Sequence, residues 1–468
     1  MIESPLARLT DEQIEELGSE LDAIHDEVFG ELGDRDRRYI TSMIEMHRRL
    51  VVLGRIVLLG SRYKPAWIAG TSMLTLAKIL ENMEIGHNVM HGQWDWMNDP
   101  QINSSTWDWD SASTAEAWKH SHNYVHHTYT NILGKDHDLG YEIMRIDPHQ
   151  KWNPVYLAQP FYNLLLAALF EWGVAGHDLD FKAVARGEKS KEKVRRELKG
   201  MVRKGREQIT KDYIVFPLLS ALAATAAEVA VETVRQRRRS ELGGALGKVR
   251  RKLRSSRSGG LVATAGGVLE GGAFQRSFKS TLLADVTANV VRNVWAYGII
   301  FCGHFPDQTY TFSESEVEDE SRGAFYVRQL LGAANIEGGP LFHVMSGNLG
   351  YQVEHHLYPD MPSTRYAEIA PRVKELCARY DLPYNTGPFL SQFAMVQRTI
   401  LRLAFPGGKP RPKPGPYRGD DAAPAPSTGR RNGSTGQHGS APSSRRTACA
   451  CRCPTRIDGR PGQCCARA

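Results

Sequence analysis

Residues 65–91 read PAWIAGTSMLTLAKILENMEIGHNVMH, an apolar stretch that leads directly into two histidines. Its apolar part, 65–83, is long enough to cross a membrane, because a helical span needs about twenty predominantly apolar residues. A shorter apolar stretch, 48–60, precedes it across the polar turn 61–64. The two stretches together predict a helical hairpin in a membrane, with a histidine pair at its end.

Further apolar stretches at 213–234 and 280–303 predict two more spans. The segment 155–176 carries a proline and a glutamate. We interpret it as interfacial or re-entrant, because the basic segment 182–211 that follows should stay in the cytoplasm. The predicted fold is therefore all-α: an integral membrane helical bundle with about four spans and a cytoplasmic cap that holds the histidines.

The N-terminal region, 1–46, is predicted to be amphipathic. Thr10 and Gln13 form a potential capping box for a helix that ends near Val28. The apolar stripe of this helix consists of Leu17, Leu21, Ile24 and Val28. It would pack on the membrane or on the protein body. We expect no cleaved signal peptide, because residues 1–50 contain no apolar core.

Polar and basic stretches complete the predicted organisation. The membrane domain, 47–405, contains an atypical basic insertion at about 235–273, which would face away from the cytoplasm, against the positive-inside tendency. Residues 406–468 form a basic Cys-containing tail whose composition predicts disorder. Five of the seven cysteines lie in its last twenty residues, so a disulfide scaffold is excluded for the body. The net charge of +7 fits anionic headgroups or acidic partners.

The sixteen histidines are unevenly distributed, and seven of them form three clusters. These are His87 and His91; His122, His126 and His127; and His355 and His356. Helical residues four apart share a face, so each HxxxH pair can hold one metal ion. Adjacent histidines point about 100° apart on a helix and can reach two different ions. A lone HxxxH often occurs by chance, but three clusters beside predicted spans indicate one shared metal site.

The number of imidazoles indicates two ions rather than one. Imidazole binds iron, copper, zinc and nickel, so ligand type alone does not identify the metal. His304 follows the last predicted span and is a candidate eighth ligand; the alternative is a helix-end histidine that interacts with carbonyls. We expect His177, with His25, His47 and His438, to be uninvolved.

Carboxylates beside the clusters could accept the second ring N–H of a ligand. The candidates are Glu84, Asp136, Asp138 and Glu354, with Glu84 and Asp138 also possible ligands. Simple surface solvation is the alternative for each of them.

The motifs identify a resemblance. GHNVMHG (86–92), SHNYVHH (121–127) and NLGYQVEHHLYP (348–359) resemble, in order and surroundings, the three histidine boxes of the membrane fatty acid desaturases. The resemblance covers about 40–220 and 280–390. It is strongest to the bacterial branch related to linoleoyl-CoA and front-end desaturases, in which glutamine, here Gln352, replaces the first histidine of the third box.

The resemblance implies a di-iron centre and O2-dependent formation of a cis double bond in an acyl-CoA or acyl-lipid chain. Its ligands would be His87, His91, His122, His126, His127, His304, His355 and His356, with Gln352 at a variable ligand position. The HPGG haem motif of some relatives is absent. The two electrons would therefore come from an external ferredoxin or cytochrome-type donor with an NAD(P)H reductase. The expected location is a bacterial cell membrane with the site facing the cytoplasm, and no nucleic-acid partner is expected.

The tryptophans Trp94, Trp96, Trp107 and Trp109 would either line an acyl channel or form part of an aromatic belt at the membrane interface. Two other activities remain open. The same di-iron site could hydroxylate a lipid or alkane, and histidine pairs could instead ligate haem in a membrane electron-transfer protein. A zinc peptidase is disfavoured because no HExxH is present.

Overall fold

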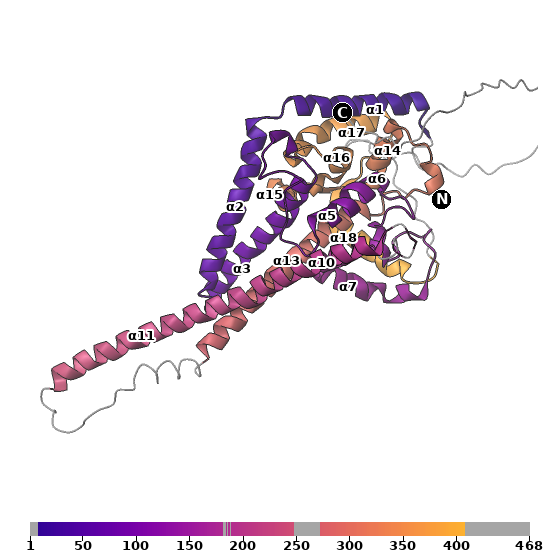
Figure 1. The fold of residues 1–468 in the computed structure, drawn as a ribbon. Coiled ribbons are helices and arrows are strands. Elements are labelled where there is room, and N and C mark those ends of the chain that lie inside the picture. Colours follow the sequence, from indigo (N-terminus) through magenta and orange to yellow (C-terminus); the bar gives the residue numbers. More distant parts are fainter. Residues whose placement is uncertain (1–7, 181–183, 185, 188, 248–271, 408–468) are drawn as a thin grey trace, which may run out of the picture. The chain divides into compact units, whose positions relative to one another are not determined.

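The computed structural model describes residues 8–180, 184, 186–187, 189–247 and 272–407, with side chains omitted from 239 to 247. Most of the predicted basic insertion and all of the tail from 408 lie outside the described residues. Helices dominate the described part (Figure 1), whose only strands are β1 (Asn335–Glu337) and β2 (Thr386–Pro388). The all-α prediction is confirmed.

The predicted helical hairpin is present as α2 (Asp34–Leu58) and α3 (Lys64–Ile79), which pack against each other. Glycine allows their close approach, since a Cβ at Gly70 would lie 2.7 Å from Leu58 Cγ. The first helix starts well before residue 48 because its polar N-terminal turns also pack, with the buried Asp36 paired to Arg365 at 2.8 Å.

A second helical pair crosses this hairpin. Helix α10 (Lys191–Thr210) continues through the π-helical turn η7 (Lys211–Val215) into α11 (Phe216–Gly247). Helix α13 (Ala273–His304) packs on both α11 and α3 (Figure 1). By length and composition, the helix over Lys191–Arg238 is the single described one that could cross a membrane.

Charged residues explain why the other predicted spans do not meet that criterion. Arg55 on α2 pairs with Asp285 on α13 at 2.5 Å and with Asp212 at 2.9 Å. Lys78 on α3 pairs with Asp212 at 2.7 Å. These groups are buried between the helices and neutralise one another, but they lower the mean hydropathy of the segments that carry them.

The cap is built on α1 (Asp11–Gly30), which packs against α14 (Arg322–Gly332) and α17 (Tyr366–Arg379). The predicted capping box of Thr10 and Gln13 is confirmed. The predicted apolar stripe is buried in the cap core. We predicted that this helix packs either on the membrane or on the protein body, and it packs on the protein body.

The predicted interfacial segment forms two short helices, α7 (Gln159–Ala168) and α8 (Phe170–His177). The strands β1 and β2 pair in parallel, with Asn335 opposite Thr386. Helix α18 (Phe389–Leu403) follows β2 and packs on α13 and α7. The remaining short helices are α4 (Asn88–Met90), η3 (Asp95–Met97), α5 (Ala115–Trp118), α6 (His127–Tyr129), η5 (Leu139–Glu142), η6 (Pro154–Ala158), η8 (Glu314–Glu316), α15 (Pro340–Met345), η9 (Leu349–Tyr351) and η10 (Ser363–Arg365).

Candidate metal centre

Each histidine cluster lies at a helix end or a distorted turn. His87 ends the π-helical turn η2 (Leu80–His87), and the backbone N–H of His91 donates to its carbonyl at 3.1 Å. His122 and His126 belong to a second π-helical turn, η4 (Lys119–His126). Such turns widen a helix locally and occur often at functional sites.

The third cluster and the candidate eighth histidine come from the other end of the chain. His355 and His356 lie in α16 (Gln352–Leu357), and His304 is the last residue of α13. The side chain of Asn335 holds α16 in place, accepting from the backbone N–H of Val353 at 2.8 Å. Segments more than 200 residues apart thus meet at one place.

The structure brings seven of these histidines into two groups, with the ligand atoms in each within 4.8 Å of one another; a third set that meets the same limit, His122, His126 and Asp138, overlaps both. The first group is His87, His91, His122 and His355; the second is His126, His304 and His356. Adjacent histidines separate into different groups at the third cluster, where the rings of His355 and His356 are inclined by 84°. The predicted divergence of adjacent pairs is confirmed there.

Distances between ring nitrogens match two ligands of one ion. Nε2 of His87 lies 3.4 Å from Nε2 of His355, and Nε2 of His304 lies 3.2 Å from Nε2 of His356. Two nitrogens bound at about 2.1 Å and at right angles are about 3 Å apart. The remaining histidine of the three clusters, His127, lies between the groups, with its ring stacked on His356 at 4.5 Å.

Several of these nitrogens have no hydrogen-bond partner among the described residues. They are Nε2 of His91, His122 and His126, both nitrogens of His127, and Nδ1 of His304. Buried polar atoms are normally hydrogen-bonded, and leaving one unpaired costs about 1–3 kcal/mol. So many unpaired imidazole nitrogens in one place fit a bound metal, which would use the same lone pairs.

Burial also keeps the rings in the neutral form that binds metal. It lowers the pKa of His87, His91, His127, His304, His355 and His356 well below the usual value. At His126, burial acts in the same direction, but the Asp136 carboxylate outweighs it and raises the pKa.

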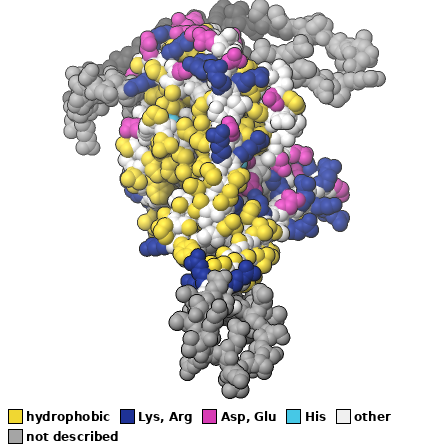
Figure 2. All heavy atoms as spheres, turned by 90° about the vertical axis from the view of Figure 1, so that its left-hand side faces the viewer, with side chains coloured by type: hydrophobic (Ala, Val, Ile, Leu, Met, Phe, Trp, Pro, Cys, Tyr) yellow, Lys and Arg dark blue, Asp and Glu magenta, His cyan; other side chains and the backbone are white. Residues whose placement is uncertain are grey.

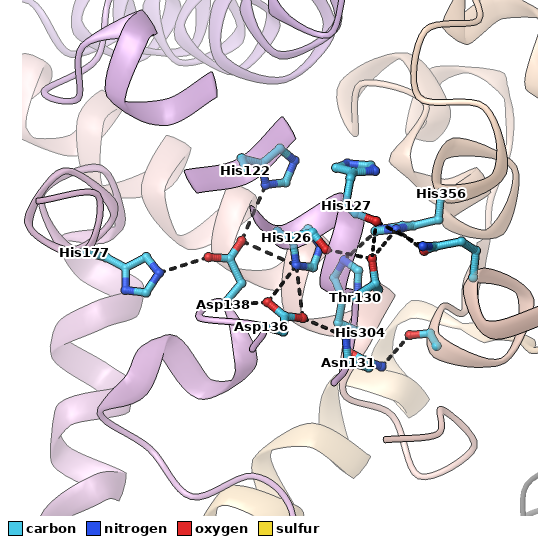
Figure 3. Close-up of polar contacts among 12 residues, drawn as sticks. His122, His126, His127, Thr130, Asn131, Asp136, Asp138, His177, His304 and His356 are labelled. Carbon is cyan, nitrogen blue, oxygen red and sulfur yellow. Dashed lines mark hydrogen bonds and ion pairs between the residues drawn. The ribbon is translucent and has the colours of Figure 1, made fainter. Parts of the chain in front are cut away.

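Two of the four predicted carboxylates contact the histidines (Figure 3). Asp136 Oδ1 lies 3.1 Å from Nδ1 of His126, and Asp138 Oδ2 lies 3.5 Å from Nδ1 of His122. His177, which we expected to be uninvolved, lies with Nε2 3.1 Å from Asp138 Oδ1 (Figure 3). It orients the carboxylate that orients the ligand, a role that its isolated position in the sequence did not indicate.

The other two carboxylates do not contact a histidine ring, so the prediction for them is wrong. Glu84 accepts from Tyr39 at 2.8 Å and from Asn348 at 3.0 Å. Glu354 accepts from Tyr384 at 2.7 Å and from Asn335 at 2.8 Å. Both are buried, and these hydrogen bonds connect neighbouring elements.

Gln352 lies at the second group, with Nε2 3.0 Å from Nε2 of His304. The absence of a side chain at Gly303 makes this possible, since a Cβ there would lie 2.8 Å from Gln352 Cγ. Sequence analysis missed Gln329, whose Oε1 lies 3.1 Å from Nδ1 of His356. Its helix carries no motif that would have indicated this contact.

A small cavity of about 50 Å³ adjoins the first group. Its lining includes His87, His122, Trp109, Trp118 and Phe170. Of the tryptophans predicted to line a channel, Trp109 alone lines this cavity, whereas Trp94, Trp96 and Trp107 pack in or against the core beneath α2.

The ring arrangement argues against bis-histidine haem. Imidazoles of the two groups contact each other directly, for example His122 and His126 with centroids 5.1 Å apart. A porphyrin needs a flat slot between two opposed histidines, and rings packed this closely leave no such slot.

Comparison with known proteins agrees with the site. The family model described as fatty acid desaturase matches residues 65–388, which include all three histidine clusters. The chain belongs to the fatty acid desaturase family.

Individual relatives of this desaturase are similar over different lengths. It is 43% identical over 400 residues to the NADPH-dependent stearoyl-CoA 9-desaturase of Mycobacterium tuberculosis, covering 86% of this chain and 82% of the relative. It is 25% identical over 340 residues to the sn-1 linoleoyl-lipid 6-desaturase of Synechocystis, covering 69% and 76%. A 121-residue segment is 33% identical to human fatty acid desaturase 3, covering 26% and 25%. No solved structure matches the desaturase significantly.

Proposed function

We propose that this enzyme is a di-iron, O2-dependent desaturase of saturated long-chain acyl-CoA that forms a cis double bond between carbons 9 and 10. The observation that carries the proposal is the convergence of eight imidazoles, seven of them buried and several with unpaired nitrogens, beside a cavity. The substrate class and bond position are inferred from the extended similarity to a stearoyl-CoA 9-desaturase.

The proposed ligands are His87, His91, His122 and His355 for one iron, and His126, His304 and His356 for the other, with His127 between them. Gln352 and Asp138 are candidates for additional contacts. When bound, the iron pair would supply the O2 chemistry that removes two hydrogens from an unactivated chain. Asp136 and Asp138 would hold the rings of His126 and His122 in the orientation that the metal requires.

The reaction balances with two external electrons. One saturated –CH2–CH2– unit, one O2, two protons and two electrons yield –CH=CH– and two waters. We infer NADPH as the ultimate electron source from the name of the relative, with a separate protein carrying the electrons. The acyl segment would enter the cavity beside His87 and His122, where Trp118 and Phe170 supply apolar surface.

The proposed location is a membrane crossed by α2, α3, α11 and α13, with the cap on the cytoplasmic side. Figure 2 shows a broad hydrophobic surface on the side formed by α2 and α3, with charged side chains above and below it. Exposed apolar residues on α2 include Val52, Leu53 and Ile56. The basic α10 on the cap side accords with the positive-inside rule, whereas Arg235, Arg237 and Arg238 at the far end of α11 run against it.

The test is fatty-acid analysis in a host that lacks its own desaturase. Expression of the full chain should produce a new cis-9 monoene, located by mass spectrometry of the methyl esters. The His355→Ala/His356→Ala variant should produce none at equal protein level. A hydroxylated product would favour the alternative oxidation, and full-length protein that binds no iron would contradict the metal assignment.

A further inference from the structure

One face of α10 carries a dense row of positive charge. Apart from Lys191 at the N-terminus of the helix, its exposed cations are Arg195, Arg196, Lys199, Arg203 and Arg206. Their spacing of three or four residues aligns them along one side of the helix. None of the five has an ion-pair partner in the part of the chain that the structure describes. Only two exposed carboxylates, Glu192 and Glu207, accompany them on the helix.

The opposite face of α10 is fixed to the body beside the second histidine cluster. A Cβ at Gly205 would lie 3.0 Å from the Trp172 ring, and one at Gly200 would lie 2.8 Å from Thr114. Thr114 is the N-cap of α5, which leads into the turn that carries His122. The buried Lys204 donates from Nζ to the carbonyl of Trp109 at 2.7 Å.

Two tryptophans connect this contact with the metal centre. The rings of Trp109 and Trp118 lie with centroids 5.2 Å apart. The Trp118 ring stacks on His122 at 4.6 Å, inclined by 23°. Trp109 also lines a groove shared with Arg48, Lys204 and other polar side chains, as well as the cavity at the histidines. Aromatic rings thus form a continuous path from the base of α10 to a candidate iron ligand.

We propose that the basic face of α10 is the docking surface for an acidic one-electron carrier protein, and that electrons pass inward by Trp109 and Trp118. The proposal rests on the proposed function, which requires an external electron supply. Each docking event oxidises the carrier by one electron and reduces the metal centre by one. Two events therefore supply the two electrons that each double bond needs.

The position of the cations along the helix favours a protein over a lipid surface. Arg195 precedes Phe216, where the apolar helix α11 begins, by 21 residues, which is about 32 Å along a continuous helix. The headgroup layer of a bilayer is only about 5–8 Å thick on each side. If α11 spans the membrane, most of the basic face therefore extends beyond the headgroups, where an acidic protein can reach it.

The first test measures binding, so it does not depend on turnover. The full chain, metal-free or iron-loaded, is placed in phosphatidylcholine nanodiscs and titrated with an acidic [2Fe–2S] ferredoxin as the probe. The variant Arg195→Glu/Lys199→Glu/Arg203→Glu should weaken ferredoxin binding about tenfold or more at low salt, and the salt dependence of binding should decrease. Turnover driven by a small chemical reductant should be unchanged.

A matched control reverses three cations at the far end of the helical pair, where Arg235, Arg276 and Lys279 line a separate groove. The variant Arg235→Glu/Arg276→Glu/Lys279→Glu changes the net charge equally and should keep ferredoxin affinity within about twofold. Equal weakening by both variants, or ferredoxin that does not bind the unmodified protein, would overturn the proposal. So would an α10 variant that loses binding to phosphatidylglycerol vesicles while ferredoxin affinity is unchanged. Failure of turnover with the chemical reductant would instead count against the proposed function.

The second test separates electron transfer from docking. In Trp109→Leu, ferredoxin affinity should stay within about twofold, while reduction of the protein by bound ferredoxin, without acyl substrate, should slow at least tenfold in stopped-flow spectra. Trp109→Phe, which keeps a ring, should recover most of the rate. Equal rates in the leucine variant and the unmodified protein would exclude the tryptophan path.

Discussion

Two buried polar networks lie within this protein and differ in how their groups are satisfied. In the helical bundle, each charged group of Arg55, Lys78, Asp212 and Asp285 has a partner of opposite charge. In the cap, eight histidines lie together, seven of them buried, and several ring nitrogens have no partner in the described part of the chain. The charges of the first network are paired within the chain, although Arg55 Nε and Asp285 Oδ2 lack a hydrogen-bond partner there. The second network has no opposite charge on most of its rings and fits an external ion.

The comparison shows how to distinguish buried polar groups that stabilise the fold from buried polar groups that bind a ligand. Burying a charge is expensive unless a partner compensates for it, so a paired network can persist for the fold alone. An unpaired network stays destabilising until a ligand binds, and its retention indicates that the ligand is part of the native state. Predictions for each network can therefore test this distinction.

The largest effect is expected at His127, whose two ring nitrogens both lack partners. His127→Ala should lose bound iron and desaturation together, measured by elemental analysis and product formation. The exposed His120, on the preceding helical turn, offers a matched control, and His120→Ala should retain both. If His127→Ala keeps two irons per chain, the His127 ring serves packing, and its unpaired nitrogens do not indicate a metal ligand.

A large effect on folding, but not on metal binding, is expected from the paired network. Asp212→Asn removes the shared partner of Arg55 and Lys78 and should lower the free energy of unfolding by about 3–5 kcal/mol. Iron content per folded protein should not change. Adding Lys78→Met should recover part of the loss, because it removes one uncompensated cation; thermal unfolding of both variants checks this. Selective loss of iron in Asp212→Asn would contradict the division into two networks.

A moderate effect on metal affinity is expected from Asp138, which contacts a proposed ligand. Asp138→Asn removes the carboxylate beside His122 and should weaken metal affinity about 10–100-fold, as other orienting carboxylates do. Competition with a chelator measures this affinity. Glu84→Gln is the control, since Glu84 is more deeply buried than Asp138 but contacts no histidine, and its metal affinity should change by less than that of Asp138→Asn.

A smaller effect is expected at His177, which reaches the centre only through Asp138. His177→Phe should weaken metal affinity by a few-fold, less than Asp138→Asn. In the Asp138→Asn background, the additional change should be close to zero, because the two residues act through one contact. Additive losses would mean that His177 acts on the metal by another route.

The smallest effect is expected from the C-terminal tail. Residues 408–468 have a composition that predicts disorder, so deleting them should change neither iron content nor desaturation. Gly407 should be kept, because its carbonyl accepts from Arg145 Nη1 at 3.1 Å. Loss of iron on deletion would give the tail cysteines a role in the site.

Sequence patterns were sufficient for local features with a fixed spacing. The hairpin of α2 and α3, the capping box at Thr10 and the histidine clusters could all be predicted, because each depends on residues within one or two helical turns. The number of spans could not be read in the same way. We predicted about four spans, whereas one described helix meets the length and composition criterion for a span. Charges such as Arg55 and Asp285, which pair across 230 residues, lower the mean hydropathy of the other segments.

The sequence by itself determined the ligand chemistry of this protein: three histidine clusters whose number and spacing suit two metal ions. Only the tertiary structure decided which carboxylates support them. Asp136 and Asp138 reach histidine rings, Glu84 and Glu354 do not, and His177 and Gln329 join from other helices. The physical reason is that spacing fixes the direction of a side chain on its own helix, whereas its partners depend on how distant helices pack.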